Sequence, residues 1–319
     1  MKTARPLVFC SSCLGFRKCR WNGVTVPNEF VERLQKHADL VDNCPEVEIG
    51  LGVPRKPVRI ISVKGRKSLV QPDTRSDFTS KMNSYIDRLL PKLKDVDGFI
   101  LKSRSPSCGI RDVKVYPGME KSGAISAREP GFFGGRLAEQ YPLKIIEDEA
   151  RLRNCRLREH FLTVVFASAN FRKARESSDI RELLEFHSIN KFLLMSYNQK
   201  ELKELGRIVA CAKDNSDAFR DYEAHLSAAF SGVPRTSSVC NAFYRMYGHF
   251  SKKLGKDESR IFNESMGKLR ENRIPIGQVA ESISSMAARF GDSYIRDQTM
   301  LEPYPQDFIS VCYPEIRQR

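Results

Sequence analysis

The sequence lacks any long hydrophobic run. No stretch of the 319-residue chain reaches the roughly 18 consecutive apolar residues that a membrane-spanning helix needs. The beginning of the chain, MKTARPLVFCSSC, also lacks the apolar core of a secretory signal peptide, because polar residues interrupt it after a few positions. These two absences argue against a secreted protein and against a membrane partner, and we expect a cytoplasmic protein.

Cysteine is present, but not in the pattern of a disulfide-bonded scaffold. The nine cysteines are an odd number and are spread over the whole chain, whereas small disulfide-rich domains space theirs densely. The repeated CxxC pairs of a zinc ribbon and the cysteine run of a ferredoxin are absent as well. In a reducing compartment, such cysteines bind metals or act in catalysis more often than they form disulfides.

The charge of the chain is strongly one-sided. The sequence has 53 Lys and Arg residues against 39 Asp and Glu residues, a formal net charge of +14 at pH 7. The excess occurs in both halves of the chain, which is typical of proteins that bind a polyanion, most simply a nucleic acid. Charge alone fits a basic protein without such a partner equally well, and no protein partner is evident from the sequence.

The order of predicted elements divides the chain near residues 147–152. Over residues 1–150, apolar strands alternate with amphipathic helices, which predicts an α/β domain built on a parallel sheet. Over residues 151–319, glycine becomes rare and apolar residues recur at helical spacing, which predicts an all-α domain. A chain of this length, with 41% hydrophobic residues, can form two such cores.

Four segments carry more specific expectations. Residues 26–42 contain the pattern of an amphipathic helix, residues 58–70 that of a β-hairpin, and residues 180–197 that of one helix. Residues 43–57 (NCPEVEIGLGVPRKP) contain three prolines and two glycines. Because these residues interrupt regular structure, we expect a long ordered loop there.

Three cysteines lie in loops where ligands usually bind. Cys13 follows a predicted strand over residues 6–9, Cys44 lies in the loop 43–57, and Cys108 follows a buried strand that ends at Leu101. In an open α/β sheet, the loops at the carboxyl ends of the strands line the ligand crevice. One such cysteine is more often a small buried core residue. Three in comparable settings favour a functional site, although spacing alone does not show that they meet.

Three segments of the first half together resemble the signature segments of the thiouracil desulfidase family. They are SSCLGFRKCRWNG, CPEVEIGLGVPRKP and LKSRSPSCG. Members of this family hold a 4Fe–4S cluster through one cysteine from each segment and remove sulfur from thiolated pyrimidines. The second half resembles the helical domain that is fused behind this one in the bacterial tRNA 4-thiouridine desulfidases, through FHSINKFLLMSYN, LGRIVA, NAFYRMYGHFSKKL and SYIRDQTMLEPYP. The resemblance implies an enzyme that converts 4-thiouridine in tRNA, or a thiouracil-type nucleobase, to the uridine form and sulfide.

The resemblance also implies roles for individual residues. The cluster ligands fall on Cys13, Cys44 and Cys108, which leave one iron open, and the catalytic pair falls on Glu46 and Ser105. An open metal position is what a catalytic site needs, and a soft thiocarbonyl sulfur suits iron as a Lewis acid. Glu46 would then activate the attacking water, and Ser105 would donate to the ring or orient it.

The first segment departs from the family pattern in two places. LGF follows Cys13 where LLG is usual, and Cys10 stands at a position that is normally apolar. Cys10 is therefore an alternative first ligand. We choose Cys13 because it keeps the family's distance to the CRWNG segment, and we expect Cys10 and Cys19 to lie outside the ligand set.

Several other features have two interpretations. Arg17, Arg20 and Arg104 flank the proposed ligands and are either phosphate contacts for RNA or a solvated basic rim. The glycine-rich segment GFFGG over residues 131–135 lacks the lysine of a P-loop, and we interpret it as a turn. For the whole chain, the competing hypothesis is a non-catalytic RNA-binding protein in which the three cysteines hold a structural zinc ion.

Overall fold

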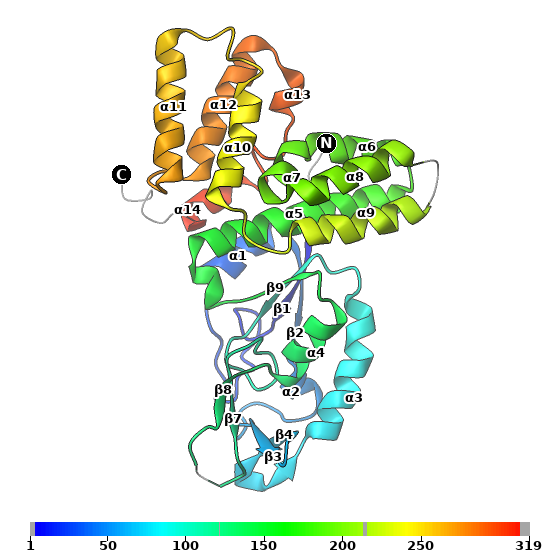
Figure 1. Cartoon of the computed structure of the whole chain (residues 1–319). Coiled ribbons are helices and arrows are strands. Elements are labelled where there is room, and N and C mark those ends of the chain that lie inside the picture. The colour runs from blue at the N-terminus through cyan, green and yellow to red at the C-terminus, as the bar shows by residue number, and fades with distance from the viewer. Residues whose placement is uncertain (1–3, 121, 213–215, 313–319) are drawn as a thin grey trace. The chain divides into compact units, whose positions relative to one another are not determined.

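The structure, a computed structural model, describes residues 4–120, 122–212 and 216–312 (Figure 1). The chain divides into two compact units. Within the described ranges, the α/β unit comprises residues 5–161 and 309–312, and the helical unit comprises residue 4 and residues 162–308. None of the helices in these ranges is both long enough and apolar enough to span a membrane.

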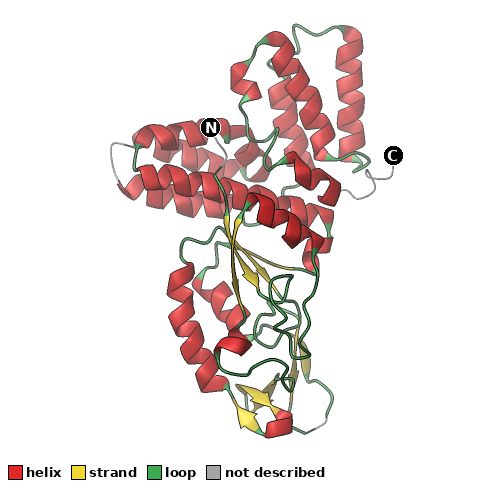
Figure 2. Cartoon of the chain, turned by 180° about the vertical axis from the view of Figure 1, so that it is seen from behind, coloured by secondary structure: helices red, strands yellow, loops and turns green. Residues whose placement is uncertain are grey.

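Four parallel strands form the main sheet of the α/β unit, in the order β2-β1-β6-β9 (Figure 2). Their bounds are β1 (Leu7–Ser11), β2 (Asp39–Asn43), β6 (Gly98–Leu101) and β9 (Ile145–Asp148). Every residue of β6 is buried, as expected of a strand that is covered on both faces of a parallel sheet. The predicted fold class, a parallel-sheet α/β domain followed by an all-α domain, is confirmed.

Aromatic rings join this sheet to the helices that cover it. The longer helices of the unit are α1 (Glu29–His37), α3 (Thr79–Leu89) and α4 (Phe132–Gln140), and short 3-10 turns are η1 (Pro72–Thr74), η2 (Leu90–Leu93) and η3 (Arg151–Arg153). The ring of Phe9 on β1 lies 5.9 Å from that of Phe99 and 5.4 Å from that of Phe133 on α4. Burial of each ring stabilises the fold by about 1.5–3 kcal/mol. These contacts therefore hold α4 firmly against the sheet.

A second sheet of five strands, in the order β5-β4-β3-β7-β8, was not expected. Its bounds are β3 (Arg59–Val63), β4 (Arg66–Gln71), β5 (Ser76–Asp77), β7 (Val113–Tyr116) and β8 (Ser126–Glu129). The predicted hairpin is confirmed, since β3 and β4 pair antiparallel across Lys64 and Gly65, both at positive φ. The sheet is mixed, because β3 pairs parallel with β7.

Two segments differ from the sequence prediction. The helix expected within residues 26–42 is α1, which ends at His37. Ala38 follows as the cap of the helix, and Asp39–Asn43 form β2. The loop expected over residues 43–57 begins with a short helix, α2 (Pro45–Glu48). Proline suits the first turn of a helix, where its missing N–H would have no partner in any case. The helix therefore begins directly after Cys44.

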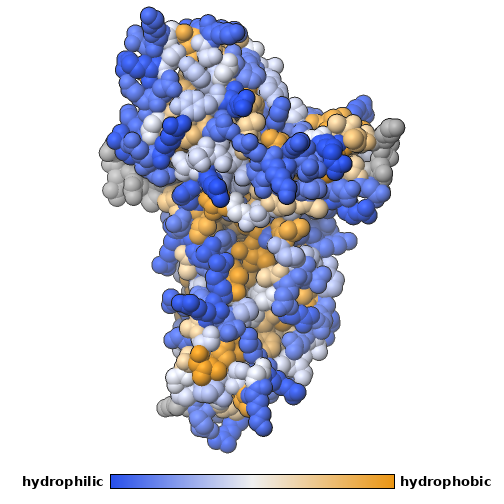
Figure 3. Space-filling view, in the orientation of Figure 1, coloured by the Kyte–Doolittle hydropathy of each residue, from blue (hydrophilic) through white to orange (hydrophobic). Residues whose placement is uncertain are grey.

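Some large apolar side chains of the α/β unit reach the surface. Figure 3 shows hydrophobic side chains of this unit, in orange, between hydrophilic ones in blue. Trp21, the single tryptophan of the chain, is 47% exposed, and Val24 and Val53 are 41% and 40% exposed. Such exposure is unusual for tryptophan, which is highly buried on average.

The helical unit consists of helices with short connections. Their bounds are α5 (Cys155–Ser177), which contains the boundary between the units, α6 (Ile180–Ile189), α7 (Lys191–Tyr197), α8 (Gln199–Cys211), α9 (Ser216–Ala229), α10 (Thr236–Tyr247), α11 (Lys256–Arg270), α12 (Ile276–Phe290), α13 (Ser293–Arg296) and η4 (Gln306–Phe308). A further short helix, α14 (Ile309–Cys312), belongs to the α/β unit. The single helix predicted over residues 180–197 is two helices, α6 and α7, which meet at Asn190.

A buried amide network explains this break. The Gln298 side chain accepts a hydrogen bond from the N–H of Phe192 and donates to the carbonyl oxygens of Ser188 and Tyr294. Its neighbour Thr299 donates to the Asn190 side chain at 2.7 Å. The backbone groups that the break leaves without helical partners are thus satisfied by side chains. The QT pair within SYIRDQTMLEPYP therefore has a structural role.

We predict that Gln298→Ala lowers the free energy of unfolding by about 2–4 kcal/mol, because each buried backbone group left without a partner costs about 1–3 kcal/mol. Urea unfolding of the full chain, followed by circular dichroism, measures the change. Gln278→Ala is the matched control, since Gln278 is exposed on α12, and it should stay within about 0.5 kcal/mol of the parent. Equal effects of the two substitutions would contradict the structural role.

Candidate functional site

The carboxyl ends of the four parallel strands meet at one edge of the main sheet. Cys13 follows β1, Cys44 follows β2, and the loop that carries Cys108 follows β6. Glu149 follows β9. Because the strands are parallel and adjacent, residues far apart in the sequence converge at this edge.

The thiols at this edge form a connected group. The thiol of Cys19 hydrogen-bonds those of Cys13 and Cys44, and the contact with Cys13 is the main reason that the pKa of Cys19 is raised to about 11. The pKa of Cys44 is raised as well, chiefly by its hydrogen bond with Cys19. Burial raises the pKa of Cys108 to about 12, and Cys44 adds to this effect. Cys19, Cys44 and Cys108 are therefore held as neutral thiols that become thiolates only when a cation or another charge compensates them.

Cys19 contacts this group of thiols, and the expectation that it lies outside the set of cluster ligands stays a prediction. Its side chain is buried, and its thiol lies between those of Cys13 and Cys44. Cys10, the alternative first ligand, lies within β1 with no exposed surface, and burial raises its pKa. Cys13 thus shares its surroundings with Cys19 and Cys44, whereas Cys10 interacts electrostatically with Asp42, Cys108 and Glu149.

Glu46 is buried, with 9% of its surface exposed, and interacts electrostatically with Cys44 and Cys108. Arg55 donates to its Oε2 atom through Nε at 3.0 Å and Nη2 at 2.7 Å. The Ser107 hydroxyl donates to Oε1 at 3.0 Å, and the Ser105 hydroxyl lies 3.5 Å from the same atom. The two oxygens of the carboxylate therefore have different surroundings, one cationic and one hydroxylic.

Ser105 shapes the loop that carries Cys108. Its Oγ accepts hydrogen bonds from the N–H groups of Ser107 at 3.2 Å and Cys108 at 3.1 Å, and its carbonyl oxygen accepts from the N–H of Gly109 at 2.9 Å. The hydroxyl proton remains available for an acceptor, and Glu46 Oε1 is the acceptor nearest to it among the described contacts. Glu46 and Ser105, predicted separately from the sequence, are thus adjacent.

The glycine-rich segment GFFGG packs against the loop that carries Cys108. At the beginning of α4, the N–H groups of Phe132, Phe133 and Gly134 donate to the carbonyl oxygens of Pro106 and Ser107. A Cβ atom on Gly134 would lie 2.3 Å from the carbonyl oxygen of Gly109. The segment is therefore part of a close backbone contact. Its N–H groups are already used, which excludes them from a phosphate cradle.

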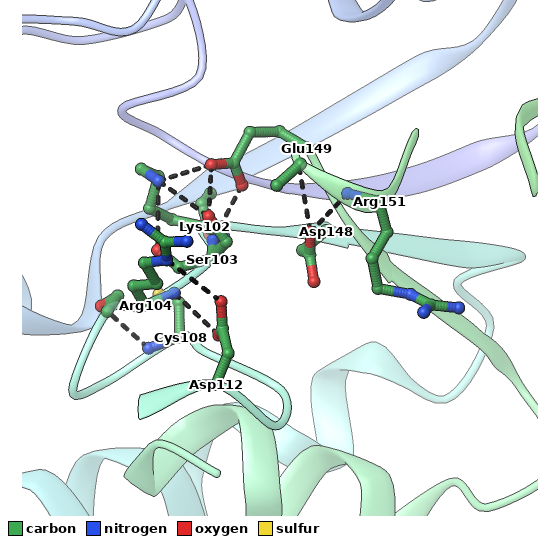
Figure 4. Close-up of polar contacts among 11 residues, drawn as sticks. Lys102, Ser103, Arg104, Cys108, Asp112, Asp148, Glu149 and Arg151 are labelled. Carbon is green, nitrogen blue, oxygen red and sulfur yellow. Dashed lines mark hydrogen bonds and ion pairs between the residues drawn. The ribbon is translucent and has the colours of Figure 1, made fainter. Parts of the chain in front are cut away.

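A second network of hydrogen bonds fixes the beginning of the Cys108 loop, at Lys102 and Ser103 (Figure 4). The Glu149 carboxylate accepts from the Ser103 N–H at 2.8 Å, from the Ser103 hydroxyl at 2.7 Å and from the Lys102 ammonium. Burial raises the pKa of Glu149, but the hydrogen bonds from Lys102 and Ser103 outweigh it and hold the pKa below its usual range. Sequence reasoning missed Glu149, Arg55 and Cys19, because only their spatial neighbours reveal them.

The basic residues proposed for RNA lie around this edge with different partners. Arg17 forms an ion pair with Asp42 at 2.9 Å. Arg104 adopts positive φ and is 85% exposed, and its Nε lies 3.7 Å from Asp112. Arg20 is half-buried. Arg17 and Arg104 present much of their charged surface to solvent, so they are accessible to an anion.

The fold and the site define a class of protein: a parallel α/β unit with a buried group of thiols, a glutamate and serines at the carboxyl edge of its sheet. Residues 8–149 match the family model described as 2-thiouracil desulfurase. Residues 191–305 match the model of a family described as protein of unknown function, DUF1722. The chain belongs to the 2-thiouracil desulfurase family, and the resemblance inferred from its sequence is confirmed.

Two known proteins are similar to the chain. The uncharacterized protein YbbK of Bacillus subtilis (strain 168) is 32% identical over 110 residues, which cover 32% of this chain and 73% of YbbK. The solved structure of the 4Fe–4S-dependent thiouracil desulfidase TudS has 21% sequence identity and a TM-score of 0.38. That match covers 46% of this chain and 93% of the TudS chain.

We predict that Gly134→Ala disrupts the Cys108 loop. The clash with the backbone should cost about 1–3 kcal/mol, more than the gain of about 1 kcal/mol from alanine within a helix. Alkylation of the protein, read by mass spectrometry, should show faster modification of the otherwise buried Cys108. In the control Gly118→Ala, the added Cβ atom has open space, and Cys108 should react as in the parent. Unchanged protection of Cys108 in Gly134→Ala would show that the contact is not needed.

Proposed function

We propose that the chain is a desulfidase that depends on a 4Fe–4S cluster and converts 4-thiouridine in tRNA, or a thiouracil-type base, to the uridine form and sulfide. The observation that carries this proposal is the meeting of Cys13, Cys44 and Cys108 beside the adjacent pair Glu46 and Ser105. The three cysteines come from three loops, and the family to which the chain belongs supports the same assignment.

The donor set suits such a cluster. Cysteine thiolates are the usual ligands of iron–sulfur centres, and the surroundings of Cys44 and Cys108 raise the pKa of both thiols, so that each would lose its proton only beside a compensating cation. The buried hydroxyl of Ser12, next to Cys13, has no hydrogen-bond partner among the described residues. A buried hydroxyl without a partner is costly, and a sulfide or thiolate beside it would accept a hydrogen bond from it. Cys13, Cys44 and Cys108 would hold the cluster.

A structural zinc ion is the competing assignment for the same cysteines. A zinc site needs its ligands around one ion, with Zn–S distances of about 2.3 Å. Within residues 4–120, 122–212 and 216–312, no group of three His, Cys, Asp or Glu side chains is arranged to hold one metal ion. The iron and zinc content of the purified protein distinguishes the two assignments.

The residues of the site suit a hydrolytic reaction. When bound, a cluster with one iron free of protein ligands supplies a soft Lewis acid for the thiocarbonyl sulfur. Glu46 would take a proton from the attacking water through Oε1, while Arg55 supplies countercharge at Oε2. Ser105 would donate its hydroxyl proton to the ring or hold the water in place. Water adds oxygen to the carbon, sulfur leaves as sulfide, and no electrons are transferred.

RNA is the proposed form of the substrate. The net charge of +14 favours a polyanion, and Arg17, Arg20 and Arg104 are the proposed phosphate contacts near the site. The helical unit, which contains the match to the second family, would bind or position the tRNA. We place the reaction in the cytoplasm, where thiols stay reduced.

We predict that substitutions of the proposed cluster ligands and of the proposed catalytic residues have different effects. Alanine at Cys13, Cys44 or Cys108 should lose the iron and the brown colour of anaerobically purified protein, because too few thiolates remain. Glu46→Gln and Ser105→Ala should keep both and lose about a hundredfold to ten-thousandfold in sulfide release from thiolated tRNA. Iron content, visible absorption and nucleoside analysis measure the three effects.

Two further variants control this experiment. Cys240→Ala replaces a buried cysteine of the helical unit and should retain iron and activity. Cys10→Ala should retain iron. If Cys10→Ala loses its brown colour while Cys13→Ala keeps it, Cys10 and not Cys13 is the first ligand. A colourless parent protein with one equivalent of zinc would refute the cluster. Full activity of Glu46→Gln would refute the assigned base.

We predict that affinity for tRNA falls steeply with salt. Three phosphate contacts give a slope of about −2 to −3 in a plot of log affinity against log salt concentration. Replacing Arg17, Arg20 and Arg104 together with Gln should remove most of that slope, as measured by fluorescence anisotropy of labelled tRNA. Lys67→Gln, in which the lost cation is paired with Glu129, should leave the slope nearly unchanged. An affinity that is independent of salt in the parent would contradict the electrostatic argument.

A further inference from the structure

We propose that Trp21 is a stacking platform for a nucleobase that neighbours the thiolated base in an RNA strand. This inference rests on the proposed function, because it assigns a place to the nucleotide next to the reacting one. It concerns a residue that is neither a proposed ligand nor a proposed catalyst. The position of Trp21, its exposure, its rigid backbone and the charges around it carry the argument.

Trp21 lies beside the thiol group in the chain. Only Arg20 separates it from Cys19, whose thiol contacts those of Cys13 and Cys44. Two residues of extended chain span at most about 7 Å, so the backbone of Trp21 is within one nucleotide's reach of the thiols. The indole is nevertheless 47% exposed, whereas Glu46 is 9% exposed. The tryptophan is thus at the rim of the site, whereas the proposed catalytic residue Glu46 is buried.

The backbone of Trp21 is held in place by the same arginine that holds Glu46. The N–H of Arg55 donates to the carbonyl oxygen of Trp21 at 2.8 Å, and its Nη1 donates to that of Cys19 at 2.9 Å. The turn after Trp21 is closed by a hydrogen bond from the N–H of Gly23 to the carbonyl oxygen of Arg20, with Gly23 at φ +73°. The platform is therefore preorganised relative to the carboxylate, which lowers the entropy lost on binding.

The surroundings of the indole favour a base over a purely apolar partner. Val24 and Val53 are exposed on two loops that touch, since a Cβ atom on Gly23 would lie 3.9 Å from Val53 Cγ1. Arg17 and Lys18, both exposed, precede the tryptophan in the same segment. An aromatic ring with basic residues beside it is the combination that binds single-stranded nucleic acid, in which bases stack on rings and cations contact the phosphates.

The platform suits the neighbouring base rather than the reacting one. The reacting carbon would have to approach Glu46 and Cys108, which are buried. A base placed there is enclosed, and the exposed ring of Trp21 is left for an adjacent nucleotide. Enzymes that act on an extruded base commonly set their sequence preference through contacts with such flanking nucleotides. Trp21 would thus favour RNA over the free base or nucleoside.

The single tryptophan makes this inference directly measurable. Fluorescence excited where tyrosine does not absorb reports on Trp21 alone. The probe is a short single-stranded RNA that contains uridine, the product form, which does not absorb the tryptophan emission. We expect this RNA to quench the fluorescence of the anaerobically reconstituted protein in a saturable manner. Saturable RNA binding, seen by anisotropy of a labelled strand, with no change in fluorescence would overturn the platform.

Variants separate stacking from a general effect on the fold. By anisotropy, Trp21→Ala should weaken RNA binding by about 5- to 150-fold, and Trp21→Phe should retain most of the affinity. The control Ile125→Ala removes another exposed apolar side chain of the same unit and should bind as the parent does. Iron content equal to that of the parent shows that the site is intact. Equal affinities of Trp21→Ala and the parent would overturn the proposal.

The free nucleoside distinguishes the neighbouring base from the reacting one. Trp21→Ala should leave the kcat/KM for 4-thiouridine nucleoside nearly unchanged while it lowers the kcat/KM for thiolated RNA. An equal loss for both substrates would place the reacting base on the indole and refute the assignment to its neighbour. If no thiolated pyrimidine releases sulfide, the proposed function fails, whereas the RNA titrations above still decide whether Trp21 binds a base.

Discussion

The ion pair of Glu46 and Arg55 joins the three cysteine-bearing segments, and the geometry of the site depends on it. Arg55 donates to Glu46 and to the carbonyl oxygen of Cys19 in the first segment. On its other side, Glu46 accepts from Ser107 in the third segment. Truncating one partner of such a buried pair costs about 3–5 kcal/mol, because the remaining charged group loses its hydrogen bonds as well as its compensation. Glutamine at position 46 keeps an acceptor oxygen for Arg55. The positions of the thiols are thus coupled to one carboxylate.

The two oxygen atoms of the Glu46 carboxylate have different partners. Oε2 is occupied by both donors of the Arg55 guanidinium, which fixes the plane of the carboxylate. Oε1 faces hydroxyl groups, which can rotate, and only these would have to move when a water molecule binds. An arginine fork is well suited to the first task, since its planar donors match a carboxylate. The anchored oxygen therefore keeps Oε1, the proposed base, in place.

Much of the fold could be predicted from the sequence. The buried strands with little polar surface, such as β6, were recognisable because a strand covered on both faces is apolar throughout. In contrast, β2 has the sequence DLVDN and is only partly buried, so its pattern resembles the end of the preceding helix. The break at Asn190 was missed for another reason. The groups that stabilise it belong to Gln298 and Thr299, more than 100 residues away in the sequence.

The candidate site could be predicted only in part. Glu46 and Ser105 were inferred through a resemblance to a family, and the structure places them 3.5 Å apart at their nearest oxygens. Cys19 could not be separated from the other cysteines by spacing, because its importance arises from contacts with Cys13 and Cys44. Glu149 follows a different strand from the loop that it holds. The contacts of Cys19 and Glu149 both depend on the order of the parallel strands in the sheet. The local sequence does not reveal that order.

Burial at this edge of the sheet sets a condition on the proposed RNA substrate. Glu46 and Cys108 are almost fully enclosed, so a base that remains stacked in an RNA helix would not reach them. In the proposed reaction the base would have to leave its stack, which costs a few kcal/mol. Contacts outside the buried residues would have to compensate for that cost, and the net charge of +14 and the exposed Trp21 are the features proposed to supply phosphate and base contacts. The proposed buried reaction thus requires the proposed binding surface at its rim.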